Sequence, residues 1–322
     1  MSVIQVVGRG TWGTVVACSI KGMGETLEDS LQLSGQSIQD LYAVKIMKKQ
    51  DLIEDNMMKS AIIERQVLQA LNHPLLVKLH FAFQDETKLF MGMDYVPGGD
   101  LFFHLKRFGA FNERDSKFYA IEIAYALQHL HDLGIVYRDM KPENVILDAD
   151  GHIKIVDFGL AKLGVVDPFE GTDSTCGTSY YMAPEVINGQ CYGQAVDWWG
   201  LGVLLFELLT GNPPWYTRDQ TQKVLFFKVT KTALTCPPFV TGPCRDFLTK
   251  LLEKDPARRL QAGAVFAHPW TGGLTLAQLR DGKLRPPVVP CPNYAGQTAA
   301  KFARGGAVEG GGGGGGGRAK GG

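Results

Sequence analysis

The sequence lacks the features that mark membrane and secreted proteins. Its most apolar run, from Trp198 to Leu209, is short and contains Glu207, which predicts a buried helix and no membrane span. The six cysteines form no C-x-x-C pair, which argues against a zinc site and a disulfide framework. The N-terminus carries no signal-peptide pattern. These absences predict a soluble, reduced protein in the cytoplasm, with the nucleus as a second location.

Neither sign of charge is in excess. Lys+Arg and Asp+Glu number 33 each, so no basic field favours nucleic acid or an anionic membrane as a partner. Hydrophobic residues make up 45% and charged residues 20% of 322 residues, which is ordinary for a globular protein with a large core. His129 and His131 are two residues apart and do not share a helix face, which argues against a metal site there.

Short β-rich runs dominate the first hundred residues, and helical patterns follow from Pro97 onward. A helix over 113–133 is predicted from the cap residue Asn112 and the stop residue Gly134. We expect a small sheet-rich lobe followed by a larger helical one. The other predicted elements are strands at 3–7, 14–17, 42–47, 76–83 and 89–95, a surface loop over 21–40 and a helix over 57–71.

The glycines Gly8, Gly10 and Gly13 form a G-x-G-x-x-G pattern, in which backbone amides approach phosphate oxygens closely. The pattern alone is weak evidence, and the β-like residues after it disfavour a dinucleotide fold, which has a helix there. Further on, Lys45 lies within an apolar strand and Glu64 on the predicted helix. The two side chains are suited to pair, although a lysine that points into solvent is the alternative.

Polar residues are concentrated in "VYRDMKPENVILD" (136–148), where Asp139, Lys141 and Asn144 stand between apolar flanks. Polar side chains at this density are not buried without hydrogen-bonding partners. The segment is therefore either a solvated turn or faces a highly charged ligand. In "IVDFGLAK", Asp157 follows two β-branched residues, Ile155 and Val156, at a strand end where a carboxylate can meet a metal.

With "YYMAPE" and "AVDWWGLGVLLFELLTG" these segments form an ordered set, and the chain resembles the eukaryotic protein kinases over roughly residues 6–270. The chain is similar to the AGC group of serine/threonine kinases in two features: Tyr137 replaces the usual histidine of the H-R-D motif, and "TCGT" precedes A-P-E. Within that group it is nearest to the protein-kinase-B and ribosomal-protein-kinase branches. The resemblance implies an α+β, bilobal fold. The N-lobe covers residues 1–95 and consists of a sheet with one main helix, and the mostly helical C-lobe covers 96–270. A partial C-terminal extension over 271–304 and a disordered Gly-rich tail over 305–322 follow.

The resemblance implies ATP and Mg²⁺ as cofactors. Asp139 would accept the proton of the acceptor hydroxyl, and Lys141 would neutralise the transferring phosphoryl group. Asn144 and Asp157 would bind magnesium, and Lys45, held by Glu64, would bind the phosphates. The residues expected around the nucleotide are Gly8, Gly10, Gly13, Val15, Ala43, Lys45, Met93, Asp94, Val96, Ile146 and Val156, with Met93 as the gatekeeper and with hinge hydrogen bonds from Asp94 and Val96.

Regulation is also implied by the resemblance. An upstream kinase would phosphorylate Ser174, with Thr175 as the alternative site, and Arg138 and Lys162 would bind that phosphate. Two architectural contacts are expected: an ion pair between Glu185 and Arg259, and support of the catalytic loop by Asp197.

The resulting prediction is a serine/threonine protein kinase that acts on proteins with an arginine upstream of the phosphorylated residue. Asp100, Glu143, Glu207 and Thr178 match substrate-binding positions of the family, with ordinary surface charge as the alternative for the three acids. A pseudokinase scaffold is the alternative function, and the complete A-P-E segment disfavours a small-molecule kinase. Three departures from the family pattern are Trp12 in the phosphate loop, the long 21–40 segment and the absence of an F-x-x-F motif after residue 285.

Overall fold

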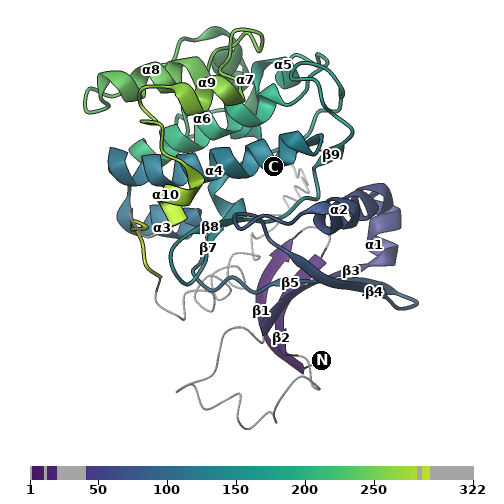
Figure 1. Cartoon of the computed structure of the whole chain (residues 1–322). Helices are drawn as coiled ribbons and strands as arrows, with labels where there is room; N and C mark the ends of the chain where they lie inside the picture. Colours follow the sequence, from purple (N-terminus) through teal and green to yellow (C-terminus); the bar gives the residue numbers. More distant parts are fainter. Residues whose placement is uncertain (1, 11–12, 20–40, 281–284, 291–322) are drawn as a thin grey trace, which may run out of the picture.

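The structure, a computed structural model, describes residues 2–10, 13–19, 41–280 and 285–290. An antiparallel sheet with adjoining helices forms the N-terminal part, and a mostly helical part follows it (Figure 1). The expected α+β fold class is therefore confirmed. Trp12, the predicted loop over 21–40 and the tail over 305–322 lie outside the described residues, as does most of the predicted extension over 271–304. The boundaries drawn at 95 and 270 stay predictions.

The N-terminal sheet has the strand order β1-β2-β3-β5-β4, and all of its pairs are antiparallel. In the register, Val15 pairs with Lys45, and Ala43 pairs with Met93. Because directly paired residues share a face and side chains alternate along a strand, these four side chains lie on the same face. The strands are β1 (Ser2–Gly10), β2 (Gly13–Ser19), β3 (Leu41–Lys48), β4 (Leu79–Gln84) and β5 (Lys88–Asp94).

Two helices connect β3 to β4. The longer one, α2 (Met58–Ala70), agrees with the prediction, and its buried face includes Glu64. The six-residue α1 (Lys49–Glu54) was not predicted, because it buries only Leu52 and so has no apolar period. The prediction that β4 begins at residue 76 is wrong by three residues. Val77 N donates instead to the Ile155 carbonyl at 3.0 Å, which ties this stretch to the helical part.

The C-terminal part is built around α6, which is buried along nearly its whole length. This burial accounts for its apolar sequence, and none of the described helices has the length and hydropathy to cross a membrane. Helix α4 begins as predicted, because the Asn112 side chain accepts the Asp115 N–H at 3.0 Å, and Gly134 follows its end with φ of 68°. The helices are α3 (Leu101–Phe108), α4 (Glu113–Asp132), α5 (Pro184–Ile187), α6 (Ala195–Thr210), α7 (Gln222–Lys231), α8 (Gly242–Leu251), α9 (Ala262–Ala267) and α10 (Leu276–Arg280).

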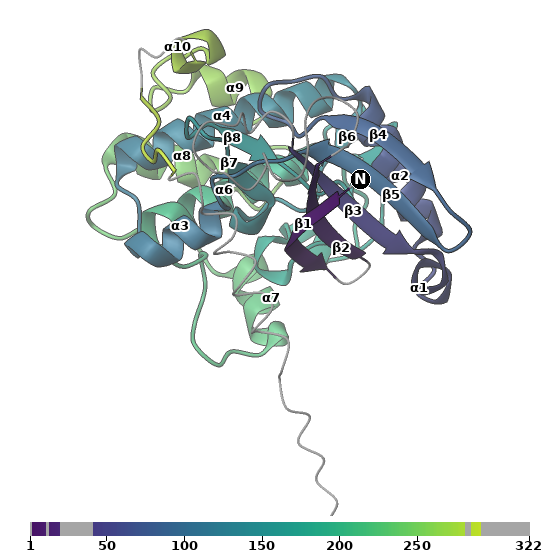
Figure 2. The same cartoon turned by 90° about the horizontal axis from the view of Figure 1, so that it is seen from below.

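Two short strand pairs hold the polar segments in place. β6 (Ile135–Val136) pairs with β9 (Lys162–Leu163), and β7 (Val145–Leu147) pairs with β8 (Ile153–Ile155). Seen from below, β7 and β8 lie between the N-terminal sheet and helix α4 (Figure 2). The polar residues of the two motifs therefore stand on loops whose ends are fixed by backbone pairing.

Residues 285–290, which belong to the predicted C-terminal extension, pack along the helical part. Val288 N donates to Tyr119 Oη at 3.3 Å. A Cβ atom at Gly151 would lie 2.0 Å from the Val288 carbonyl oxygen, and one at Gly98 would lie 2.6 Å from Pro290 Cγ. Gly151 therefore requires glycine while the segment is in this place, whereas at Gly98 the Leu147 carbonyl oxygen, 2.3 Å from such a Cβ atom, requires glycine even without the segment.

Candidate active site

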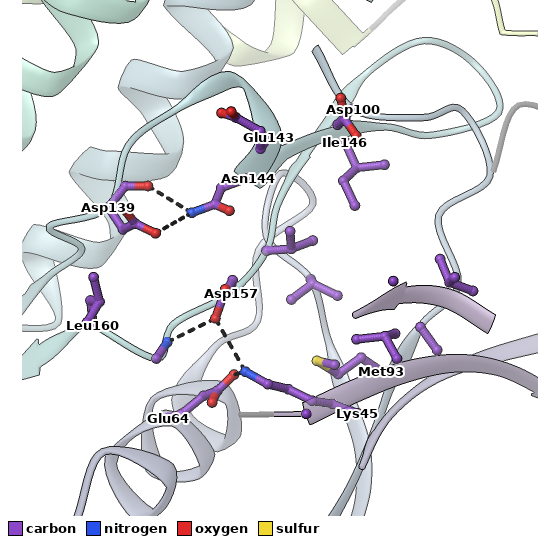
Figure 3. A pocket seen from close by; sticks show the side chains of 18 of the residues that line it. Lys45, Glu64, Met93, Asp100, Asp139, Glu143, Asn144, Ile146, Asp157 and Leu160 are labelled. Carbon is purple, nitrogen blue, oxygen red and sulfur yellow. Dashed lines mark hydrogen bonds and ion pairs between the residues drawn. The ribbon is translucent and has the colours of Figure 1, made fainter. Parts of the chain in front are cut away.

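A cavity of about 580 Å³ lies between the N-terminal sheet and the helical part. Figure 3 shows side chains from both parts directed into it. Gly10 ends β1 next to residues that are not described, so its relation to the cavity stays a prediction. The predicted residues that line the cavity are Gly8, Gly13, Val15, Ala43, Lys45, Glu64, Met93, Asp94, Val96, Asp100, Asp139, Lys141, Glu143, Asn144, Ile146, Val156, Asp157 and Thr178.

Lys45 joins two carboxylates at the inner end of the cavity. Its Nζ lies 2.6 Å from Glu64 Oε1 and 3.4 Å from Asp157 Oδ1 (Figure 3). Burial acts to lower the pKa of Lys45, but the two carboxylates outweigh it and raise that pKa. Burial also raises the pKa of Glu64, and the ammonium group opposes that rise. The predicted Lys45–Glu64 contact is confirmed, and it holds the Lys45 ammonium group at the wall of the cavity.

Asp157 stands at a sharp turn of the chain. Its φ of 58° is uncommon for a residue other than glycine. The turn is held by a hydrogen bond from Gly159 N to Asp157 Oδ1 at 3.3 Å and by the buried Phe158 ring, which packs edge-on against Tyr137. Burial opposes ionisation of Asp157, but Lys45 and the Gly159 N–H lower its pKa overall. The side chain is therefore a carboxylate at neutral pH.

Asp139 is buried and is oriented by three donors. Lys141 Nζ lies 2.6 Å from its Oδ2, Asn144 Nδ2 donates to the same oxygen at 2.8 Å, and Thr178 Oγ1 donates to Oδ1 at 3.1 Å. Asn144 Nδ2 also donates to the Asp139 carbonyl at 2.9 Å. Because both bonds use the amide nitrogen, Asn144 Oδ1 is left as the acceptor that a cation needs.

The outer part of the cavity is apolar. Val15, Ala43 and Met93 line it from the sheet, and Ile146 lines it from β7. A Cβ atom at Gly13 would lie 2.8 Å from the Ile46 carbonyl oxygen, so the start of β2 requires glycine. An apolar slot that leads to a lysine and then to two oxygen ligands fits a nucleotide base, its phosphates and Mg²⁺.

The described residues include no cluster of three or more His, Cys, Asp or Glu side chains that would hold a metal by themselves. Magnesium keeps waters and phosphate oxygens as ligands and needs only one or two protein carboxylates. Asp157 and Asn144 fit that requirement.

Arg138 lies next to Asp139 and reaches toward Ser174. Its Nε donates to the Leu160 carbonyl at 2.6 Å, and its Nη1 donates to Ser174 Oγ at 2.7 Å. No ion pair of Arg138 with a carboxylate is found within the described part of the chain. Lys162 lies in β9, opposite Val136, and its predicted role toward Ser174 stays a prediction.

The two predicted architectural contacts are confirmed. Arg259 and Glu185 form a buried pair with N–O distances of 2.6 and 2.9 Å. Asp197 accepts the backbone N–H groups of Tyr137 and Arg138 at 2.9 and 2.8 Å. It also contacts His131 Nε2 at 2.8 Å, a partner that was not predicted because the two residues are far apart along the chain.

The three acids assigned to substrate binding differ in their surroundings. Asp100 is buried and caps α3 by accepting the Phe103 N–H at 2.7 Å, and burial raises its pKa to about 6. Glu207 is buried beside the Tyr181 hydroxyl, which donates to it, and burial raises its pKa to about 7. Glu143 is exposed. The alternative of ordinary surface charge is therefore wrong for Asp100 and Glu207.

Two tyrosines of the site were missed in the sequence. Tyr181 holds Glu207, and Tyr192 is buried against Ser174 and Arg138. Tyr181 lies inside the motif "YYMAPE", but nothing in that motif indicates a partner in α6. The sequence around Tyr192, "GQCYGQ", has no pattern that indicates a site.

The family described as "Protein kinase domain" matches residues 1–271. Similar curated proteins include a RAC family serine/threonine-protein kinase homolog of Dictyostelium discoideum (40% identical, over 89% of this chain and 61% of that protein) and ribosomal protein S6 kinase alpha-2 of Homo sapiens (40%, over 89% and 38%). Another is the RAC serine/threonine-protein kinase of Drosophila melanogaster (39%, over 89% and 45%). The chain thus spans between 38% and 61% of the length of these three relatives.

Proposed function

Because the chain belongs to the protein kinase domain family, we propose that it is an ATP-dependent serine/threonine protein kinase of the AGC branch. The observation that carries the proposal is the convergence of Lys45, Asp139, Asn144 and Asp157 at the inner end of one apolar cavity. When bound, ATP supplies the phosphoryl group to be transferred and Mg²⁺ supplies positive charge on its oxygens.

Lys45 has the position and charge to bind the phosphates, and Glu64 keeps its ammonium group from turning away. Asp157 and Asn144 present oxygens for magnesium. The slot made by Val15, Ala43, Met93 and Ile146 accepts the base, and the backbone of Asp94 and Val96 is proposed to bind its edge. Catalysis is thus positioning and electrostatic stabilisation, with no covalent intermediate on the protein.

Asp139 is proposed to take the proton of the acceptor hydroxyl. Three donors hold its carboxylate in one orientation, which leaves little freedom for unproductive geometry. Lys141 lies between Asp139 and Thr178, where its charge also stabilises negative charge on the transferring group. Thr178 fixes the segment next to the acceptor, which supports its assignment to substrate binding.

Ser174 is proposed as the activating phosphorylation site. Its hydroxyl already contacts Arg138, whose charge is not neutralised by a carboxylate within the described residues. A phosphate there would form charge-assisted hydrogen bonds with the guanidinium group. Lys162 is proposed as the second cation. The identity of the upstream kinase and the cytoplasmic or nuclear location stay predictions.

The substrate is proposed to be a protein with arginine upstream of the phosphorylated serine or threonine. The negative charge of Glu143 contributes to the raised pKa of both Glu207 and Asp100. Such a group of acids is relieved by a cation, which supports recognition of a basic side chain.

The test is phosphate transfer from Mg-ATP to a serine peptide with an upstream arginine. The parent protein, phosphorylated at Ser174, is compared with Asp157→Asn and with the surface control Asp132→Asn. We expect turnover in the parent and the control, and a loss of about a hundredfold or more in Asp157→Asn. Absence of turnover in the parent would contradict the proposal and favour a non-catalytic scaffold.

A further inference from the structure

Three neutral hydroxyl groups surround the guanidinium of Arg138. Its Nη1 lies 2.7 Å from Ser174 Oγ, 3.2 Å from Tyr192 Oη and 3.4 Å from Thr172 Oγ1. We call Thr172, Ser174 and Tyr192, whose hydroxyl groups contact Arg138, the hydroxyl cluster. Thr172 Oγ1 and Ser174 Oγ are also within 3.1 Å of each other. The segment that carries the proposed phosphosite is therefore already seated on Arg138 without a phosphate.

Tyr192 is the member of the cluster that is fixed from outside the segment. Its backbone pairs with that of Thr172 through two hydrogen bonds of 3.1 and 2.8 Å, and its side chain is buried, with 2% of its surface exposed. It lies three residues before α6, the most buried helix of the protein. Ser174, in contrast, is exposed and has no helix or strand to hold it.

The Tyr192 hydroxyl makes two bonds with defined directions. It donates its single proton to the Ser174 carbonyl oxygen at 2.5 Å and accepts the Arg138 Nη1–H at 3.2 Å. Cys176 Sγ lies 3.8 Å from Tyr192 Oη and is left as a weak donor to that hydroxyl oxygen. Burial raises the pKa of Tyr192, so the hydroxyl keeps the proton that it donates.

The cluster is connected to the catalytic loop. Arg138 N donates to Asp197 Oδ1 at 2.8 Å, and the next residue in the chain is Asp139. Arg138 also has a φ of 68°, a conformation that a residue other than glycine keeps only when its surroundings hold it. Bonds to its guanidinium group therefore help to hold the backbone that places Asp139.

We propose that Tyr192 is a positioning residue that holds the unphosphorylated segment 172–178 on Arg138 and so sets the basal activity of the enzyme. The activity part of this proposal rests on the proposed kinase function. A phosphate at Ser174 makes stronger, charge-assisted bonds to Arg138, so the Tyr192 hydroxyl matters most before phosphorylation and much less after it.

The first test needs no catalytic activity. Amide hydrogen exchange of residues 172–178 is measured on unphosphorylated full-length protein for the parent, Tyr192→Phe and the control Tyr216→Phe, which removes an exposed phenol hydroxyl from the same part of the molecule. The loss of two hydrogen bonds should speed exchange about five- to tenfold in Tyr192→Phe. The control should stay within about 1.5-fold of the parent, and an unchanged rate in Tyr192→Phe overturns the proposal.

Ser174→Ala provides a second, independent variant. It removes the Ser174 hydroxyl but keeps the carbonyl oxygen that Tyr192 binds, so segment 172–178 should exchange within about twofold of the parent. If Ser174→Ala opens the segment as much as Tyr192→Phe does, the Ser174 side chain holds the segment and the proposal is wrong.

The second test compares kcat/KM of parent and Tyr192→Phe, each with and without phosphate on Ser174. We expect a loss of about fivefold without phosphate and of less than about twofold with it. An equal loss in both forms would mean that Tyr192 has only a structural role. If the parent transfers no phosphate in either form, the proposed function fails, while the exchange experiment still decides whether Tyr192 holds the segment.

Discussion

At the scale of single residues, charge and burial separate side chains that look alike in the sequence. Arg258 and Arg259 are neighbours, yet Arg259 is buried against Glu185 whereas Arg258 lies 3.9 Å from Glu253 with 74% of its side chain exposed. A buried pair is strongly destabilised when one partner is removed, because the other charge is left without compensation. An exposed pair contributes little.

These neighbours give a matched prediction. Arg259→Ala should lower the free energy of unfolding by about 3–5 kcal/mol, because it leaves the Glu185 carboxylate buried and unpaired. Arg258→Ala should change it by less than about 0.5 kcal/mol. Denaturant unfolding of the purified variants measures both values, and similar losses in the two would contradict the assigned difference in burial.

Glu207 is a second residue whose environment decides its behaviour. Burial raises its pKa to about 7, so a large fraction of the side chain is neutral at pH 6 and most of it is ionised at pH 8. The proposed contact with a substrate arginine requires the ionised form. We therefore predict that KM for an arginine-containing peptide rises about threefold as the pH falls from 8 to 6.

The control for Glu207 is the same peptide with alanine in place of the arginine, measured at both pH values. Its KM should be higher throughout and should vary less with pH. Glu207→Gln should reduce the difference between the two pH values for the arginine peptide, and the remainder is expected from Asp100, whose pKa is about 6. An unchanged pH dependence in Glu207→Gln would assign the titration to another group.

At the scale of elements, periodicity and caps predicted α2 and α4, because both helices are long enough to show an apolar face and Asn112 caps α4. The shorter elements were harder to predict. Helix α1 buries a single side chain, and β6 and β9 exist only because residues 135–136 pair with residues 162–163, which the local sequence does not reveal. The start of β4 was misplaced because Val77 bonds to β8 instead of the sheet.

Helix α3 allows capping and charge to be tested separately. Its cap residue Asp100 accepts the Phe103 N–H and is also one of the proposed substrate-binding acids. Asp100→Ala should destabilise the protein by about 1 kcal/mol, whereas Asp100→Asn keeps a capping oxygen and should cost less than about 0.5 kcal/mol. Both should weaken binding of the arginine peptide equally if the charge is what binds it. Thermal unfolding and peptide KM measure the two effects, and an unchanged KM in both variants would restrict Asp100 to capping.

At the scale of the whole molecule, the candidate site is assembled from β2, β3, α2, β5, the 139–146 segment and the turn at Asp157. The resemblance of the ordered motifs to the protein kinases predicted these residues, because each motif can be recognised within one short segment of the sequence. The residues that support them, such as His131 and Tyr192, come from distant parts of the chain and carry no local pattern. Long-range contacts of this kind became visible only in the folded structure.

Another long-range contact gives a prediction for the stability of the whole fold. His73, which precedes β4, stacks on His129 of α4 with ring centroids 4.7 Å apart. Burial, together with the positive charges of His129, Arg280 and Lys154, lowers the pKa of His73 to about 4. In the unfolded chain the imidazole has its ordinary pKa of about 6.5.

The sign of the pH dependence follows from this difference. Between about pH 6.5 and pH 4 the unfolded chain binds a proton at His73 and the folded protein does not, so stability is present above pH 6.5 and is lost as the pH falls toward 4. After allowance for the partial exposure of His73, we expect a loss of about 1–2 kcal/mol from this residue. Denaturant unfolding at pH 7 and pH 5 measures it. His73→Gln should make the decrease between these two pH values smaller, whereas an equal decrease in the variant would mean that other groups cause it.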